Sequence, residues 1–339
     1  MGYNRQQKKM KKTLFLALML MIAATSFAQQ QMATLNHNDS ISVFYGTYAL
    51  RDAHNAAVAG DVITLSPGNF TACDISKAVT IRGVGAAYDS LSNTHPTIIS
   101  DDFVISPNDS VYSLEMEAIY INGMMNYNEV YNPKFRKCII EKYLSYNFKG
   151  NSIGTEFVNC IIKEIAGTAY SDFTFIGSVI YSSSISSSAT MCLNSLLITH
   201  STLSKLNAMN SIITRSASGG YLSGNSIAYN CIFIKNDFTN EMWDDNTNNT
   251  NMIVQKLSDV FESFNNLSLP AFSTDERYIL KEEIATSFLG SDGTEVGIHG
   301  GMFPFDTRPS YMIVKKCNVA NKSTIDGKLS VDIEVMVEE

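Results

Sequence analysis

The sequence predicts an all-β solenoid built from short stacked coils, because one pattern recurs six times between residues 135 and 235. Each copy places a small residue before two apolar ones, and the small residues are Cys138, Cys160, Ser178, Ser195, Ser211 and Cys231. The intervals between successive copies are 22, 18, 17, 16 and 20 residues. Repeats of about 20 residues with β-branched apolar runs indicate units that stack on their neighbours. Each unit is too short for a crossover through a full helix, which favours a β-solenoid.

Two columns of aligned residues predict how each coil is built. The residue before the small one is asparagine in four copies and glycine in a fifth, with Lys137 as the exception. Asparagine and glycine best tolerate a left-handed backbone, so a bend between two strands is expected there. Three positions before the small residue, the copies read Phe135, Phe157, Phe175, Cys192, Ala208 and Ala228. Stacked rings that give way to small residues predict an interior that narrows or is filled from another element.

Two consecutive apolar residues in every copy predict an apolar column on the outside of the solenoid. Neighbouring strand residues point to opposite faces, so one residue of each pair faces outward. Such a column would run along about 25 Å of surface, which is rarely left exposed. We expect the C-terminal segment or a partner to cover it, and an oligomer could form through this column. The alternating stretch Lys328–Val335 is predicted to be a strand with one buried face and part of that cover.

The same register brings opposite charges together between the first two copies. Glu141 is expected opposite Lys163, and in the next position Lys142 is expected opposite Glu164. Cross-strand pairs of this kind stabilise a sheet by about 0.2–1 kcal/mol each. The cluster could bind an acidic sugar or form a solvated ladder, and the ladder is favoured because exposed ion pairs are common.

Residues 1–28 have the organisation of a secretory signal peptide. Five basic residues precede an apolar run, and cleavage is expected between Ala28 and Gln29. Either Met1 or Met10 could be the true start. The apolar run is short for a membrane span, so the mature chain is expected without a transmembrane segment, secreted, periplasmic or at the cell surface. Loss of the five basic residues changes the formal net charge from −8 to −13, which argues against nucleic acid as a partner.

Six cysteines in an exported chain allow a disulfide framework, but their positions favour packing. Cys138, Cys160 and Cys231 occupy the small-residue column, where serine stands in the other three copies. Buried free thiols are therefore the favoured interpretation. The sequence has no Cys-x-x-Cys pair and no pair of histidines at metal-ligand spacing, so no metal site is predicted from these residues.

Residues 47–60 are predicted to form a short helix, with Thr47 as its N-cap and Gly60 at its end. This opening resembles that of secreted right-handed parallel β-helix proteins of the pectate-lyase-like superfamily. The residues that carry the resemblance are Leu50, Ala53, Ala57, Gly60, Asp61, Ile63, Leu65, Pro67, Gly68, Asn69, Phe70, Val79, Thr80, Ile81, Arg82 and Gly83. In that family the helix caps the first coil. His54 lies on its apolar side and is interpreted as a core histidine rather than a catalytic one.

Residues 236–251 are polar and are expected to leave the coil as a loop. Trp243 lies there beside Asp244 and Asp245, so the three could stack a sugar and hold a cation. A loop whose tryptophan packs on the outside of the solenoid is the favoured interpretation.

Segments between residues 278 and 301 resemble the closing coil of the same family. Asp292 and Glu295 could bind calcium there, although a role in stabilising a glycine-rich turn is favoured. The parallel β-helix is therefore predicted over residues 29–301. Residues 302–339 are predicted as a C-terminal extension that contains one or more strands and packs outside it.

The resemblance concerns architecture, and family members include lyases, hydrolases and non-catalytic surface proteins. Hydrolases of this class combine paired aspartates with Gly-His-Gly and Arg-x-Lys elements. This chain has Asp101-Asp102 and Asp244-Asp245 without the other two. A lyase needs a basic side chain and a group that neutralises a uronate. The candidates are Lys142, Lys163, Arg215 and Lys235.

The leading hypothesis is an exported non-catalytic β-helix, structural or in contact with a glycan. The alternative is a polysaccharide lyase or glycoside hydrolase that acts on an acidic glycan.

Overall fold

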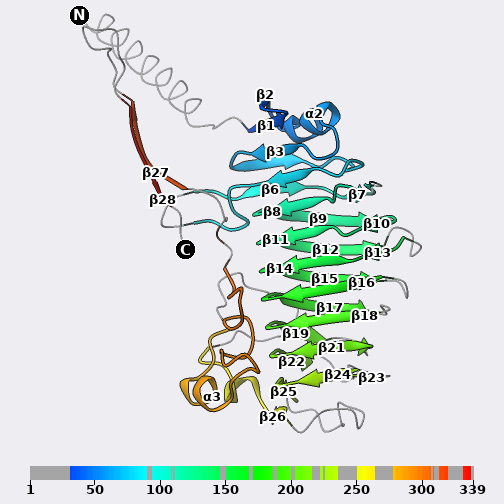
Figure 1. Ribbon diagram of the computed structural model, residues 1–339, viewed down its shortest axis with the longest axis vertical. Helices are drawn as coiled ribbons and strands as arrows, with labels where there is room; N and C mark the ends of the chain where they lie inside the picture. Colours follow the sequence, from blue (N-terminus) through cyan, green and yellow to red (C-terminus); the bar gives the residue numbers. More distant parts are fainter. Residues whose placement is uncertain are drawn as a thin grey trace, which may run out of the picture.

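The chain folds into a parallel β-solenoid whose coils stack along one axis (Figure 1). The computed structural model describes residues 31–89, 94–107, 109, 111–145, 150–167, 171–185, 189–199, 203–215, 222–223, 226–235, 250–263, 278–306, 308, 313–319 and 331–336. Strands dominate this part of the chain, which confirms the predicted all-β fold class. No helix within these ranges is long and apolar enough to cross a membrane.

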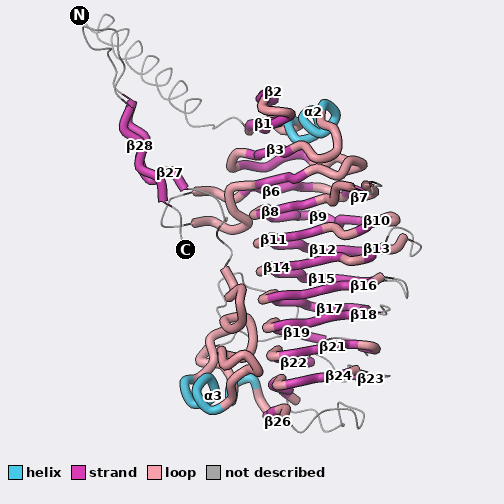
Figure 2. The backbone as a smooth tube through the Cα atoms, viewed as in Figure 1, coloured by secondary structure: helices cyan, strands magenta, loops and turns pink. Residues whose placement is uncertain are grey.

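Two 11-stranded sheets form the long walls of the solenoid (Figure 2). Sheet A contains, in spatial order, β2 (Ser40–Tyr45), β1 (Met32–His37), β3 (Val62–Leu65), β5 (Thr80–Arg82), β8 (Glu115–Glu117), β11 (Lys134–Arg136), β14 (Thr155–Val158), β16 (Asp172–Ile176), β18 (Ala189–Leu193), β21 (Leu206–Met209) and β24 (Ile227–Tyr229). Only β1 runs against its neighbours β2 and β3; the other neighbouring strands of this sheet are parallel.

Sheet B lies on the other side of the core, and its neighbouring strands pair in parallel. It contains β26 (Met252–Val254), β25 (Ile232–Ile234), β22 (Ile212–Arg215), β19 (Leu196–Thr199), β17 (Val179–Ile185), β15 (Ile161–Gly167), β12 (Ile139–Ser145), β9 (Tyr120–Tyr127), β6 (Thr97–Ser100) and β4 (Gly68–Thr71), with β7 (Phe103–Ile105) also on β9. Two short parallel pairs close parts of the third side, β10 (Val130–Tyr131) with β13 (Ser152–Ile153) and β20 (Leu203–Ser204) with β23 (Leu222–Ser223).

The small residues of the six copies line up along the axis, as predicted. The backbone N–H of Cys160 donates to Ser178 Oγ, and that of Ser178 donates to Ser195 Oγ, each at 3.1 Å. Ser178 Oγ in turn donates to the carbonyl of Phe157 in the preceding coil, at 3.2 Å. A small hydroxyl or thiol is required because this column lies inside the wall and satisfies buried backbone groups. Cys138, Cys160 and Cys231 are buried free thiols, which confirms the packing interpretation.

The corner before each small residue has the expected left-handed backbone. The φ angles are 54° at Lys137, 53° at Asn159, 53° at Gly177, 44° at Asn194, 52° at Asn210 and 49° at Asn230. Lys137 adopts this conformation although a left-handed backbone costs an ordinary L-residue roughly 1–2 kcal/mol. Its ammonium forms an ion pair with Asp306 at 3.4 Å, so the exceptional residue has a contact of its own.

Aromatic rings fill the upper interior. Phe135, Phe157 and Phe175 stack with centroid separations of 5.1 and 5.3 Å. Lower down, where this column becomes Cys192, Ala208 and Ala228, sheet B contributes Leu197, Ile213 and Phe233 to the same core. The same column of sheet B is Ile140, Ile162 and Ile180 beside the phenylalanine stack, so a larger side chain from the opposite wall is present only at Phe233, in the last copy.

Helix α2 (Ala49–Ala56) packs over the first coil, in the place predicted for a cap. It starts at Ala49 with Tyr48 as N-cap and without a side-chain cap bond, so the predicted N-cap at Thr47 is wrong. The Thr47 carbonyl instead accepts the Thr71 N–H at 2.9 Å. At the other end, Lys77 Nζ donates to the carbonyls of His54 and Asn55 in the last turn of α2 and of Ala57 at its C-cap, each at 2.8 Å. This ammonium does the work of a C-terminal cap.

The outward apolar column is covered by the chain itself. Its members, Ile139, Ile161, Val179, Leu196, Ile212 and Ile232, are at most 3% exposed. They pack in one cluster with residues from a C-terminal segment that we call the strap, described at 257–263 and 278–306. The strap carries the short helices η2 (Leu257–Asp259) and α3 (Glu282–Ser287). Cover by the C-terminal segment is confirmed, and association through this column is not available to the folded chain.

The strap follows the asparagine corner in the direction opposite to the order of the coils. Ser291 N–H donates to Asn210 Oδ1 at 2.9 Å, and further along the strap the Pro304 carbonyl accepts from Asn159 Nδ2 at 3.0 Å. Asn159 and Asn210 therefore serve twice, because they form corners of the coil and their side chains also bind the backbone of the strap.

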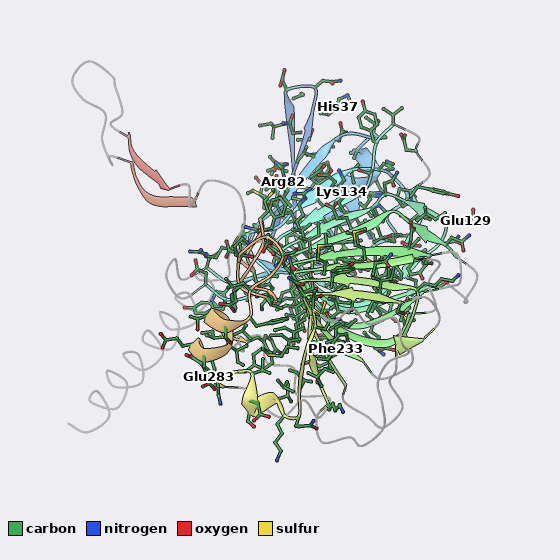
Figure 3. All side chains as sticks on the ribbon, turned by 60° about the horizontal axis from the view of Figure 1, so that its bottom comes forward. His37, Arg82, Glu129, Lys134, Phe233 and Glu283 are labelled. Atoms are coloured by element: carbon green, nitrogen blue, oxygen red, sulfur yellow. The ribbon has the colours of Figure 1, made fainter. Side chains whose placement is uncertain are left out.

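Two expectations for the C-terminal part need correction. Residues 278–301 lie in the strap rather than in a closing coil, and within the described residues the last strand in coil register is β26, so the predicted limit of the solenoid at residue 301 is too late. Gly297 and Gly301 allow close approach to the wall, at Ile212 and Asn194, instead of a coil turn. The second concerns β28 (Val331–Met336), which pairs antiparallel with β27 (Ile313–Val319) and lies apart from the coils (Figures 1 and 3). This strand is real but is not the cover, because the strap occupies that surface.

Candidate functional site

The predicted charge ladder is present on the outer surface of β12 and β15. Lys163 Nζ lies 2.5 Å from Glu141 Oε1, and Lys142 Nζ lies 3.1 Å from Glu164 Oε2. Tyr120 also donates its hydroxyl to Glu141, and burial together with this carboxylate raises the pKa of the tyrosine well above its ordinary value. Every lysine of the ladder thus has a carboxylate partner within the sheet.

This pairing limits what the ladder can do chemically. A uronate ligand would need an ammonium without an internal counter-charge, and both lysines are already neutralised by glutamates. The Tyr120 hydroxyl is held as a hydrogen-bond donor, so it is poorly suited to accept a proton. The arrangement fits a structural ladder.

The other two basic candidates lie far from this ladder. Arg215 is in register with Thr199 of the preceding coil, and the pairing continues through Ser182 and Ile165 to Tyr143, so Arg215 does not share a column with Lys142. Its side chain lies outside the described part of the structure. Four coils separate Arg215 from Lys142, which is about 19 Å at about 4.8 Å per coil. Lys235 lies one coil further and is half-buried, with its N–H on the Val254 carbonyl at 2.9 Å. The structure does not bring the four bases together.

The acidic candidates include residues outside the described ranges and one carboxylate that is bonded within the wall. Trp243, Asp244 and Asp245 lie outside the described residues. Asp102 accepts the Met124 N–H at 2.8 Å, and its carboxylate is therefore used within the wall.

The turn that contains Asp292 is held by its own side chain. Asp292 Oδ1 accepts from the Thr294 N–H at 3.0 Å and from the Thr294 hydroxyl at 2.7 Å, and these bonds lower the pKa of Asp292 against an opposing effect of burial. Glu295 Oε1 is buried without a hydrogen-bond partner, and burial raises the pKa of this carboxyl. Within the described ranges no group of three or more His, Cys, Asp or Glu residues has metal-binding geometry. The turn-stabilising interpretation fits Asp292.

His54 is almost fully buried on the inner side of α2. Its Nε2 has no hydrogen-bond partner, and burial and the Lys77 ammonium lower the pKa of the imidazole. The residue belongs to the cap and faces the interior, as the sequence predicted.

Sheet A presents a surface that the sequence reasoning missed. The position two residues before the small residue lies on its outer face and is apolar in five successive coils, at Val158, Ile176, Leu193, Met209 and Tyr229, which pair in register. Beside this column, Met191 and Ile227 are 43% and 48% exposed. We call the set Ile176, Met191, Leu193, Met209, Ile227 and Tyr229 the open stripe. Its signal is present in the repeats, as an apolar residue two positions before the small residue in five of the six copies.

The upper part of the same face is built differently. Cross-strand ion pairs join Arg82 to Glu117 at 3.7 Å and Lys134 to Glu115 at 3.5 Å. Arg82 and Lys134 are labelled in Figure 3. Sheet A therefore changes from a neutralised charge ladder near the cap to an uncharged apolar stripe over the lower coils, whereas the corresponding column of sheet B lies under the strap.

A comparison of the chain with protein-family models, curated proteins and solved structures finds no match.

Proposed function

We propose that the protein is an exported, non-catalytic parallel β-helix that contacts a glycan along the open stripe of sheet A. The observation that carries the proposal is the stripe itself, which leaves Met191, Met209, Ile227 and Tyr229 between 41% and 48% exposed on neighbouring coils. An apolar surface of this kind on an otherwise polar wall is typical of a binding face. Residues 1–28, interpreted as a secretory leader, and the resemblance to the pectate-lyase-like superfamily support an extracellular or periplasmic role.

The chemistry of the stripe favours a neutral linear polysaccharide. Coils repeat about every 4.8 Å, so the face offers a regular series of contacts to a polymer that is itself regular. Tyr229 provides an aromatic ring for the apolar face of a sugar, and Thr174 and Asn207, in register with Met191, provide neutral hydrogen-bonding groups. The stripe carries no charge, and the formal net charge of the chain is −8, so an acidic polymer gains no electrostatic attraction.

The proposal of a non-catalytic protein is supported by the paired state of its best bases. Lys142 and Lys163 are both engaged with glutamates, and Arg215 lies about four coils away. A lyase that acts on an acidic glycan remains the alternative to be tested, and its prediction is an unsaturated product whose formation depends on these lysines.

Affinity electrophoresis of the purified exported chain tests binding. Gels that contain a soluble β-glucan, a galactomannan or an acidic pectate are compared, and retardation is expected in at least one neutral gel. Tyr229→Ala should abolish it, whereas the matched control Tyr131→Ala should not, since the two tyrosines are 45% and 46% exposed on different sides of the solenoid. Migration unchanged in every gel would contradict the proposal.

The same preparations test catalysis. Absorbance of unsaturated uronate products and release of reducing ends are followed on the same three polymers, and neither is expected to rise. Product formation that disappears in Lys142→Ala or Lys163→Ala would replace the proposal with the lyase alternative.

A further inference from the structure

Strand β2 is the outermost strand of sheet A at the capped end of the solenoid. In the described part of the chain it pairs with β1 alone, in an unbroken antiparallel register from Met32–Tyr45 to His37–Ser40. Five of its six residues are exposed, and the side chains of Ile41, Val43 and Tyr45 are 69%, 42% and 60% exposed. Figure 3 shows that the β1–β2 hairpin projects past the coils, with His37 near its tip.

The free edge presents unpaired backbone groups. Gly46 N–H donates to the Gln31 carbonyl at 2.8 Å, one step beyond the Met32–Tyr45 pair. Hydrogen-bonded and non-hydrogen-bonded pairs alternate in antiparallel strands. The N–H and C=O groups of Tyr45, Val43 and Ile41 therefore point away from β1, toward solvent. The edge is a template for one more strand.

Nothing in β2 protects this edge. Natural edge strands are protected by a lysine, a proline, a bulge or short length. The six residues Ser-Ile-Ser-Val-Phe-Tyr contain no charge and no proline, and the register has no bulge. Helix α2 packs against β1, β2, β3 and β4 and so closes the interior of the first coil, yet β2 stays exposed. The cap closes the core but leaves the sheet open to extension.

We propose that β2 is an interface for a second copy of this chain, which adds its own β2 antiparallel about a two-fold axis at Val43. In this register Ile41 of one copy lies opposite Tyr45 of the other, on the same face of the joined sheet. Asp39, the nearest acidic residue of the hairpin, falls opposite Thr47, so no like charges meet. The strand is thus complementary to itself.

A second copy fits this edge better than a charged partner does. Each chain carries a formal net charge of −8, or −13 without residues 1–28, which opposes broad contact between two copies but acts less at β2, a strand without charged residues. The contact is also closed, because an isologous interface uses the same strand twice and leaves no free β2 edge. The expected product is a dimer joined end to end, with both open stripes still accessible.

Light scattering and sedimentation equilibrium of the purified full exported chain test the proposal. A concentration-dependent dimer is expected. Val43→Lys should shift the chain to monomer, because the two-fold axis brings the two ammonium groups together. Met191→Lys is the matched control, since Met191 is 43% exposed against 42% for Val43, and it should leave the dimer intact. Circular dichroism melting verifies that both variants fold.

Cysteine substitution tests the register. Val43→Cys places two thiols opposite each other at a Cα separation of about 5.5 Å, within disulfide reach, and should cross-link copies under mild oxidation. Ile41→Cys should not, because residues 41 of the two copies lie four steps apart. A monomer at every concentration, dissociation by Met191→Lys, or equal cross-linking by both cysteine variants would overturn the proposal. Open-ended polymers that Ile227→Lys shortens would overturn it in favour of head-to-tail stacking on β24.

Discussion

The contact between the strap and sheet B predicts a specific penalty for Gly297→Ala. Gly297 has a φ of +92°, and a Cβ built there lies 2.6 Å from Ile212 Cδ1. A left-handed backbone costs alanine roughly 1–2 kcal/mol, and overpacking a buried contact costs about 1–3 kcal/mol more. Reduced freedom of the unfolded chain returns about 0.4–1 kcal/mol. The variant should therefore lose about 1–5 kcal/mol of unfolding free energy.

Gly293→Ala separates the two causes. Gly293 lies in the same strap with a φ of +77°, but a Cβ there meets nothing within 4 Å. Gly293→Ala therefore incurs the backbone penalty without overpacking. Of the two glycine variants, Gly297→Ala should be less stable by about 1–3 kcal/mol. Ile212→Val removes the clashing Cδ1 atom, and the double variant with Gly297→Ala should recover most of that difference as a coupling energy.

Urea unfolding followed by circular dichroism measures the unfolding free energy of the three single variants and the double variant. The values are compared at equal slopes of free energy against urea concentration. Equal losses for the two glycine variants, or additive losses in the Gly297→Ala and Ile212→Val double variant, would refute the close packing of the strap.

Three further outcomes are expected. Ser178→Ala should lose about 1–3 kcal/mol of unfolding free energy, because it leaves the buried Cys160 N–H without an acceptor. Ser178→Cys should lose clearly less, because cysteine occupies the same column in other copies. Equal losses of the two variants in urea unfolding would contradict the hydrogen-bonding role of this column. Lys77→Met should lower the thermal midpoint at neutral pH, because three carbonyls at the end of α2 lose their donor; an unchanged midpoint would argue against the cap. Burial lowers the pKa of His54 from 6.5, so the unfolded state binds a proton first as the pH falls. The stability that the neutral His54 imidazole contributes is fully present above about pH 6.5 and declines below it. His54→Gln should therefore flatten this part of the pH profile of the unfolding free energy.

The coil architecture was predictable because its determinants are local and repeated. An asparagine or glycine at the corner, a small residue after it and a β-branched pair behind that are needed in every coil, and the pattern therefore recurs in the chain. The charge pairs between Glu141 and Lys163 and between Lys142 and Glu164 follow from the same register. Each coil supplies one copy of the information, and six copies together fix the alignment.

The sequence predicted that some segment must cover the outward apolar column, but it did not predict which segment forms the strap. The outward apolar column requires a cover, and the alternating stretch 328–335 is the segment whose pattern most resembles a half-buried strand. The actual cover, which includes Phe261, Tyr278 and Ile298, has no single period, because it contacts the wall through short helices and turns. Irregular contacts of this kind leave no repeat in the sequence.

The open stripe was predictable in principle. Its column is apolar in five copies, yet an apolar residue on a strand is expected to be buried, and only the structure shows which columns are covered. The free edge of β2 is a different case, because it depends on which strand ends the sheet. Topology decides that, not composition.

Methionine footprinting tests most directly the central claim that the open stripe of sheet A is the surface that contacts a glycan. Met191 and Met209 are 43% and 41% exposed on the stripe, Met124 is half-buried on sheet B, and Met116 is fully buried. Peroxide oxidation read by mass spectrometry should modify both stripe methionines readily and Met116 slowly. A neutral polysaccharide that retards the protein should protect Met191 and Met209 and leave Met124 unchanged. Protection of Met124 with the stripe still reactive would contradict the account.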